Sequence, residues 1–274
     1  MIEVHGLRKV FPNGHEALKD ISFAVEPGQC VAIVGRSGAG KSTLLRCLNG
    51  MVSVTSGTVS VHGIDVVRAT GAERRRLRRH IGFVYQEFNL IERLSVLDNV
   101  LVGRLGHANP FLSALRLFPR ADRELALNNL ERVHLLARAR QRADSLSGGE
   151  KQRVAIARAL TQEPFVLLAD EPVASLDPEL ARGVMEDLRL IAKTDGVPTL
   201  INIHDVNLAR LYSDRLIGIA RGEIVFDGTP GQLDDAALDR IYKPPPGVGP
   251  HAVPAPQERH IIDPAAAAFG MNAA

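Results

Sequence analysis

The chain has 274 residues, with 33 basic and 31 acidic side chains and a formal net charge of +2. Apolar residues make up 45% of it and the mean hydropathy is near zero, as in globular domains with a full core. No apolar run approaches the ~18 residues of a membrane-spanning helix, so we expect no crossing of a bilayer. The mild charge argues against nucleic-acid binding, and the first residues lack the layout of a secretory signal, which favours the cytosol.

The N-terminal residues predict a small β region. Two extended runs from Ile2 to Phe23 are separated by Phe11-Pro-Asn-Gly14, a turn sequence typical of the connection between strands. The apolar run from Cys30 to Val34 then has the pattern of a buried strand. The two cysteines, Cys30 and Cys47, are interpreted as small buried residues rather than as a disulfide or a metal-binding pair.

A phosphate-binding loop follows this strand and leads into a predicted helix from Thr43 to Leu48. Its glycines let backbone N–H groups face one anion, and the helix N-terminus adds partial positive charge. Lys41 would reach the β- and γ-phosphates of a nucleotide, and the Ser42 hydroxyl would bind Mg²⁺. An ordinary glycine-rich turn is the alternative, which the flanking strand and helix disfavour. The nucleotide-binding residues predicted here are Gly35, Arg36, Ser37, Gly38, Ala39, Gly40, Lys41, Ser42 and Thr43.

Residues 58–85 combine two predicted strands with a basic helix. The strands are the alternating residues from Thr58 to His62 and the run from Ile81 to Tyr85. Between them, a run of arginines from Arg74 to Arg79 could indicate a nucleic-acid-binding patch. Because the run falls in a short charged helix, we favour a solvated face and leave open whether it has a partner.

The pattern becomes helical from Glu87 to about Gln162, which predicts an inserted helical subdomain, about 87–162. Within it, Ser147 can cap a helix and donate to a phosphate, while Gly148 and Gly149 allow close approach of an anion. One nucleotide does not need two such loops from one chain. We therefore expect this loop to serve a nucleotide bound by another copy or a partner, with an ordinary capped helix as the alternative.

A buried parallel strand is predicted from Phe165 to Ala169, and it ends in two carboxylates. We expect Asp170 to bind the metal and Glu171 to polarise a water for attack on the γ-phosphate, rather than a merely solvated strand end. A helix from Pro178 to Ile191 and a strand from Thr199 to Ile203 follow, and a hairpin spans 215–227.

The composition changes after Lys243 to Pro, Ala and Gly with few large apolar residues. Such a segment buries too little surface to offset its ordering entropy, so we expect a disordered tail, 244–274, after a domain spanning 1–243.

These motifs together resemble the ATP-binding subunits of ABC transporters over about Ile2 to Lys243. The resemblance implies an α/β P-loop NTPase of the ABC ATPase type, with a mixed sheet core, an antiparallel β region and an inserted α-helical subdomain. It implies that the phosphate loop is the Walker A loop, that Val166 to Asp170 form the Walker B strand, and that Leu146 to Glu150 form the signature, with Glu150 where glutamine is commoner.

Further roles come from the same resemblance. It implies that Glu171 is the catalytic carboxylate. Gln86, which ends a strand, would be the Q-loop glutamine that senses Mg²⁺ and the membrane partner. His204 would be the switch histidine at the γ-phosphate, although a lone histidine is usually structural. Asp177 falls in a D-loop-like segment. Phe11 stands where tyrosine usually stacks on adenine, and stacking needs only the ring.

Three stretches, Phe11 to Ser22, Gly35 to Gly38 and Val84 to Ser95, are most similar to the ATP-binding subunits of phosphonate importers. This resemblance implies transport-coupled hydrolysis of ATP with Mg²⁺. It also implies a homodimer of ATPase subunits, transmembrane permease subunits, indirectly a periplasmic solute-binding protein, no nucleic acid, and a peripheral place on the cytoplasmic face of the inner membrane.

Alternatives stay open because an ATPase subunit does not touch the cargo. An importer for polar amino acids or another small solute is one of them. A soluble non-transport ABC ATPase is another, although such proteins usually carry two cassettes or a long coiled coil. A P-loop kinase or GTPase is disfavoured because the signature loop would have no role there.

Overall fold

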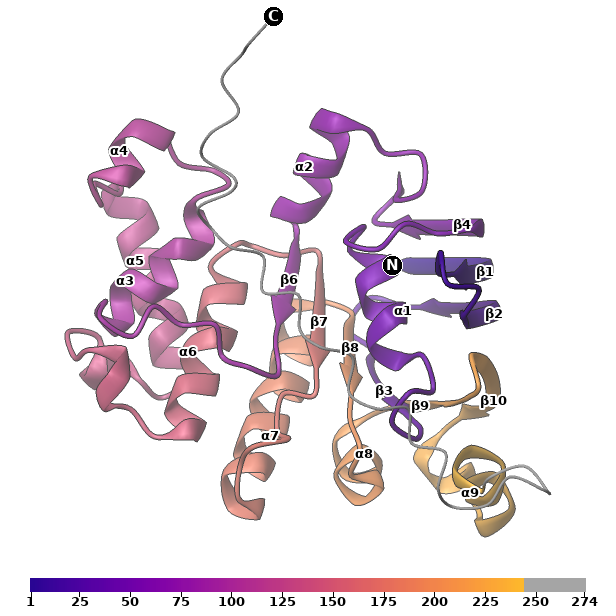
Figure 1. Cartoon of the computed structure of the whole chain (residues 1–274). Coiled ribbons are helices and arrows are strands. Elements are labelled where there is room, and N and C mark those ends of the chain that lie inside the picture. The colour runs from indigo at the N-terminus through magenta and orange to yellow at the C-terminus, as the bar shows by residue number, and fades with distance from the viewer. Residues whose placement is uncertain (244–274) are drawn as a thin grey trace, which may run out of the picture. The chain divides into compact units, whose positions relative to one another are not determined.

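The computed structural model describes residues 1–243, apart from the side chains of Pro110 and Ala114, and the predicted tail lies outside them. Residues Met1–Tyr242 form one compact unit. No helix among the described residues is both long and apolar enough to span a membrane. The unit is built on two sheets with a helical region beside them (Figure 1).

The core sheet has six strands in the order β10-β9-β3-β8-β7-β6. All neighbours are parallel except β9 and β10, which form the predicted hairpin. Every residue of β3, β6, β7 and β8 is buried, which explains their continuous apolar runs. The strands are β3 (Cys30–Val34), β6 (Ile81–Val84), β7 (Val166–Asp170), β8 (Thr199–Asn202), β9 (Arg215–Ala220) and β10 (Glu223–Gly228).

A second, antiparallel sheet confirms the predicted β region. Its order is β2-β1-β4-β5, with β1 between β2 and β4. Apolar residues of this sheet, of β3 and of α1 form one core cluster, so α1 is held between the two sheets. The elements are β1 (Ile2–Val10), β2 (Glu16–Val25), β4 (Ser56–Val61), β5 (Ile64–Asp65) and α1 (Lys41–Leu48).

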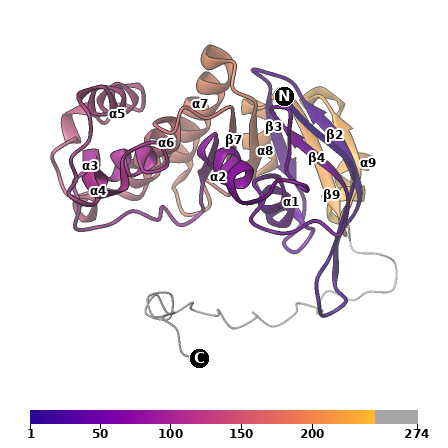
Figure 2. The ribbon, with the colours of Figure 1, turned by 90° about the horizontal axis from the view of Figure 1, so that it is seen from above.

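The helical region lies between β6 and β7 in sequence and beside the core sheet in both views (Figures 1 and 2). Pro110 is the first residue of α4 and Pro119 caps α5, so both prolines begin helices. Buried side chains of α3, α5 and α6 share one apolar cluster with β7 and α7. The helices are α3 (Val96–Leu101), α4 (Pro110–Ala114), α5 (Arg120–Arg132) and α6 (Gly148–Leu160), with short 3-10 turns at Val102–Arg104, Leu136–Arg138 and Ala143–Ser145.

The remaining helices surround the core sheet. As predicted, the arginine run forms a solvated helix, α2, in which Leu77 is the buried residue. A short helix at the end of the described chain, α9, was not predicted. These elements are α2 (Gly71–Arg79), α7 (Pro178–Asp195), α8 (Val206–Tyr212) and α9 (Asp235–Tyr242), with a 3-10 turn at Pro230–Gln232.

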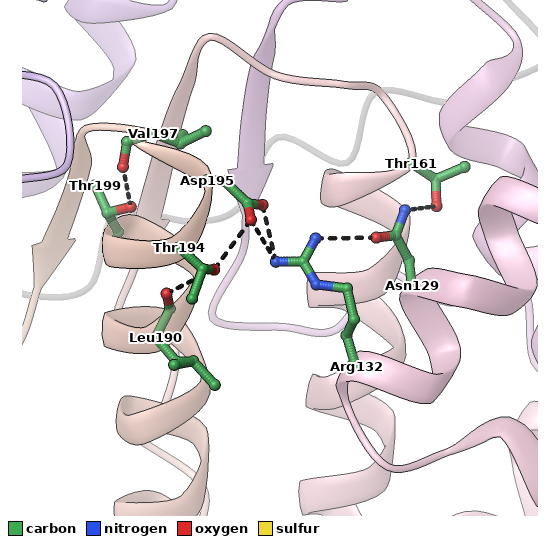
Figure 3. A network of polar contacts seen from close by, with 8 residues as sticks. All are labelled: Asn129, Arg132, Thr161, Leu190, Thr194, Asp195, Val197 and Thr199. Atoms are coloured by element: carbon green, nitrogen blue, oxygen red, sulfur yellow. Dashed lines mark hydrogen bonds and ion pairs between the residues drawn. The ribbon is translucent and has the colours of Figure 1, made fainter.

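A polar network joins the helical region to the end of α7 (Figure 3). Arg132 Nη2 donates to both carboxylate oxygens of Asp195, at 2.9 and 2.8 Å, and Nη1 donates to Asn129 Oδ1 at 3.3 Å. Asn129 in turn donates to the Thr161 hydroxyl at 3.1 Å, and Thr194 donates to Asp195 at 3.0 Å. The end of α5 is therefore tied to the end of α7 by charged hydrogen bonds outside the apolar core.

We expect the apolar contacts, rather than this network, to dominate stability. Leu130→Ala in α5 should lower the free energy of unfolding by ~2–5 kcal/mol, because the leucine is fully buried. Asp195→Ala should cost only ~0.2–1 kcal/mol, since its ion pair is about a third exposed. Urea denaturation followed by circular dichroism measures the free energy of unfolding of both variants. Equal losses of this free energy in the two variants would contradict the prediction.

Candidate functional site

The predicted phosphate loop connects β3 to α1, and two of its glycines cannot be replaced without a clash. A Cβ at Gly35 would lie 2.2 Å from the carbonyl oxygen of Ile219, and one at Gly40 would lie 2.5 Å from that of Ala17. Gly40, with φ 108°, is also the N-cap of α1, so no side chain covers the start of that helix. The loop therefore presents a helix N-terminus with free N–H donors, which suits an anion.

Lys41 folds back along this loop. It is only 4% exposed, and its Nζ donates to the carbonyl oxygens of Gly35 at 2.8 Å and Arg36 at 3.1 Å. Burial lowers the pKa of Lys41, while the negative charges of Glu171 and Asp170 act in the opposite direction. The ammonium group and the two carboxylates thus share one electrostatic site.

A cluster of three polar side chains lies where β7 and β8 end beside α1. Ser42 Oγ donates to Asp170 Oδ1 at 2.8 Å, and Asn202 Nδ2 lies 2.6 Å from the same oxygen and 3.2 Å from Ser42 Oγ. Asp170 and Asn202 are buried. Among residues 1–243, the buried oxygen Asn202 Oδ1 has no hydrogen-bond partner.

Asn202 was missed by the sequence analysis. Its signal was the polar residue that ends the strand Thr199-Leu-Ile-Asn202, beside β7, which also ends in a polar site residue, Asp170. Because the carboxyl ends of parallel strands meet at one edge, that residue could have been assigned to the site.

Glu171 and His204 form the second pair at this edge. The distance between Glu171 Oε1 and His204 Nε2 is 2.6 Å. Glu171 has a φ of 52°, a conformation that costs a non-glycine residue ~1–3 kcal/mol, and its N–H donates to Asn202 O at 3.0 Å. The turn after β7 therefore directs the Glu171 carboxylate toward His204, so the two carboxylates occupy different surroundings.

Ser147 is not brought to the phosphate loop. It caps α6 in a reciprocal pair, in which its Oγ accepts from Glu150 N at 3.3 Å and its N–H donates to Glu150 Oε2 at 2.9 Å. Gly148 and Gly149 form the first turn of α6. Both views show α6 and α1 on different sides of β7 (Figures 1 and 2). Within one chain the two predicted anion loops are thus separate.

Three further predicted residues lie at the margins of the site. Gln86 is exposed and follows the end of β6 at Val84 by two residues, which corrects the expectation that it ends the strand. Asp177 caps α7, accepting from the N–H groups of Glu179 and Leu180. Phe11 follows β1, with the Lys9 ammonium 5.0 Å from its ring centroid. None of the three makes a contact that assigns its role.

The two cysteines are free and fully buried, as predicted. Burial raises the pKa of Cys30 to about 12 and that of Cys47 to about 11. Both thiols therefore stay protonated at neutral pH and take no part in the chemistry of the loop between them.

Comparison with known proteins identifies the family behind this geometry. Residues 18–174 match the family model described as ABC transporter. The chain belongs to the ABC transporter family. The fold predicted for this family, a mixed core sheet with an antiparallel β region and an inserted helical part, is the one observed.

Individual members of the ABC transporter family align over most of the chain. It is 52% identical over 239 residues to the phosphonates import ATP-binding protein PhnC of Nitratidesulfovibrio vulgaris, covering 87% of this chain and 90% of that protein. It is 46% identical over 269 residues to the protein of the same name from Chromohalobacter salexigens, covering 96% and 99%. The dimeric post-hydrolysis structure of the ATP-binding cassette MJ0796, bound to ADP and Pi, superposes with a TM-score of 0.73 at 32% identity, covering 84% of this chain and 99% of that one.

Proposed function

We propose that the chain is the ATP-hydrolysing subunit of an importer for phosphonates. The observation that carries the hydrolytic part is the meeting of Lys41, the Ser42–Asp170 pair and the Glu171–His204 pair at one edge of the parallel sheet. The solute is supported by relatives 52% and 46% identical, which are phosphonates import ATP-binding proteins.

The phosphate groups of ATP are proposed to bind the loop from Gly35 to Thr43. The loop offers the uncapped N-terminus of α1 and the Lys41 ammonium, whose present bonds to loop carbonyls keep it along the loop. Phe11 offers a ring for stacking on adenine.

The Ser42–Asp170–Asn202 cluster fits Mg²⁺, which prefers oxygen ligands. Ser42 and Asp170 would hold the ion, and Asn202 Nδ2, which contacts an oxygen of each, would position them. Gln86 is proposed as a further ligand from the chain that leaves β6. When bound, the ion supplies charge neutralisation to the β- and γ-phosphates.

Hydrolysis is assigned to the Glu171–His204 pair. Glu171 would orient a water and accept its proton as the water oxygen bonds to the γ-phosphorus and the bond to ADP breaks. His204, 2.6 Å away, would hold the carboxylate in place and contact the departing phosphate. The left-handed backbone of Glu171 fixes this direction.

The γ-phosphate site is proposed to be completed by a second copy of the chain. Ser147, Gly148 and Gly149 form an anion-suited helix start on α6, away from their own phosphate loop. In a symmetric pair, each signature loop would face the nucleotide of the other subunit, and Asp177 would lie near that interface. The similarity to a dimeric ATP-binding cassette supports this arrangement.

The permease is proposed to dock beside Gln86. A surface cleft of about 250 Å³ lies there, between the core and the helical region, and Met51, Tyr85, Asn89 and Arg158 are among its lining residues. A docked permease would hold the chain peripherally at the cytoplasmic face of the membrane. The same permease would link ATP hydrolysis to a solute-binding protein.

Glu171→Gln should keep ATP affinity and abolish hydrolysis, because the amide preserves shape but cannot accept the proton. Lys41→Ala should lose ATP binding or turnover, because the cation at the phosphates is removed. Steady-state phosphate release and fluorescent-nucleotide titration separate the two effects. Turnover by Glu171→Gln at the parent rate would exclude Glu171 as the base.

Mixed dimers test the shared site. A Lys41→Ala subunit paired with a Ser147→Arg subunit retains one site with both loops intact, whereas each mutant homodimer has none. We expect each homodimer to be inactive and Ser147→Arg monomers still to bind ATP. Normal hydrolysis by either homodimer, or loss of monomer ATP binding in Ser147→Arg, would assign the signature loop to its own chain's nucleotide.

The solute is tested in proteoliposomes that contain the chain and its permease. A phosphonate-loaded binding protein should raise ATP hydrolysis several-fold over the unloaded protein, while polar amino acids should not. Stimulation by an amino acid with none by phosphonates would replace the proposed solute and leave the ATPase assignment intact.

A further inference from the structure

The arginines of α2 form a strongly basic surface that the ATPase site does not use. The helix exposes five arginines: Arg74, Arg75, Arg76, Arg78 and Arg79. Two of them donate to backbone carbonyls, Arg74 to Ala69 and Arg78 to Gly50. No ion pair within residues 1–243 neutralises any of the five, whereas Arg104, Arg132 and Arg215 all have carboxylate partners.

An exposed apolar segment lies in the neighbouring part of the helical region. Residues 105–117, which include α4, carry several large apolar side chains in solvent, with Phe111 75%, Leu115 58% and Leu117 57% exposed. Leu105 and Leu112 are also exposed, at 47% and 44%. A monomeric domain rarely leaves so many large apolar side chains uncovered in one short segment, so this one points to a contact.

The two features adjoin each other. A Cβ at Gly106 would lie 2.9 Å from Arg79 Cγ, and the rings of His80 and His107 are 5.6 Å apart edge to face. A surface pocket of about 370 Å³ between them is lined by Ala72, Arg75, Arg76, Arg79, His80 and His107. In Figure 1, α2 and α4 both reach the upper end of the described fold. The basic pocket therefore meets the apolar segment at residues 106–107, and the exposed arginines of α2 and the exposed apolar side chains of residues 105–117 are together named here the α2–α4 surface.

This surface also borders the cleft proposed for the permease. Arg78 of α2 and Gly103, just before the apolar segment, line that cleft, while Arg75 and Arg79 line the adjoining pocket. The side of a peripheral subunit that meets its permease is the side turned toward the bilayer. This orientation toward the bilayer rests on the proposed function, whereas the basic and apolar composition of the α2–α4 surface is independent of it.

We propose that the α2–α4 surface binds the surface of an anionic phospholipid bilayer. The guanidinium groups of Arg75, Arg76 and Arg79 would bind lipid phosphates, and Phe111 and Leu115 would insert among the headgroups and upper acyl chains. Basic side chains beside protruding apolar ones are the composition of interfacial membrane contacts. Arginine suits phosphate because its planar fork donates two hydrogen bonds together.

Other occupants explain less of the surface. A free phosphate would use the basic pocket but leave Phe111 and Leu115 in water. A nucleic acid would use the arginines and one stacking ring, Phe111, but it would leave the four exposed leucines of the segment in water. A lipid surface satisfies both halves at once.

The test is cosedimentation of the full chain, without permease or nucleotide, with vesicles. A two-to-one mixture of phosphatidylcholine and phosphatidylglycerol is compared with phosphatidylcholine alone. We expect binding to the anionic vesicles to be much the stronger and to fall as salt shortens the screening length to ~3 Å at 1 M. Equal binding to both vesicles, or binding to neither, would overturn the proposal.

Matched variants locate the contact. Arg75→Gln/Arg76→Gln/Arg79→Gln should weaken binding by about fivefold per arginine, about a hundredfold in total. The control Arg140→Gln/Arg221→Gln/Arg240→Gln removes three exposed arginines elsewhere and should bind like the parent. Phe111→Ser/Leu115→Ser should also weaken binding, although it removes no charge. Equal losses in the two arginine variants, or parent-level binding by the apolar variant, would overturn the proposal.

Two further measurements keep this result separate from folding and catalysis. Circular dichroism melting shows that each variant is folded, since the substituted side chains are exposed. Lys41→Ala should bind vesicles like the parent, so a failed ATPase assignment would leave vesicle binding unaffected. Arginine variants that bind vesicles normally but lose permease-stimulated hydrolysis would assign the surface to a protein partner and overturn the lipid proposal.

Discussion

The candidate site depends on the parallel register of β3, β8 and β7. In that register Asn202 is paired with Ile33 on one side and with Asp170 on the other. Its amide therefore reaches the Asp170 carboxylate and the Ser42 hydroxyl from a fully buried strand end. A shift by one residue would turn Asn202 to the opposite face of the sheet and leave a buried carboxylate without this donor. Hydrophobic burial of β3, β8 and β7 thus sets the geometry of the polar cluster.

The phosphate loop and the signature loop lie in different parts of the fold. The phosphate loop continues directly from a central strand, whereas the signature loop begins α6 in the helical region. That region shares an apolar cluster with the core and is also tied to α7 by the Arg132–Asp195 pair. Because water screens this partly exposed ion pair, it contributes little to the free energy of unfolding. The Arg132–Asp195 pair therefore adds one directional contact between the helical region, which carries the signature loop, and α7.

Much of the fold could be predicted because its signals are local. The apolar runs before Gly35 and Asp170, the turn residues at Phe11 to Gly14 and the hairpin around Arg221 each determine an element by themselves. Asn202 was missed because its importance arises from strand pairing, which a single apolar run does not reveal. The left-handed backbone of Glu171 and the pairing of Glu171 with His204 likewise arise from contacts between distant segments.

The phosphate loop is wedged between the two sheets, and this affects how it binds an anion. The Ile219 carbonyl of β9 approaches one end of the loop and the Ala17 carbonyl of β2 the other, while Gly222 N donates to Ala39 O at 3.0 Å. A loop held from both sides loses little conformational freedom when a ligand arrives, so little of the interaction energy is spent on ordering it. Its affinity for phosphate is therefore a property of the assembled sheets: a substitution that loosens β2 against β9 would weaken binding while leaving every residue of the loop unchanged.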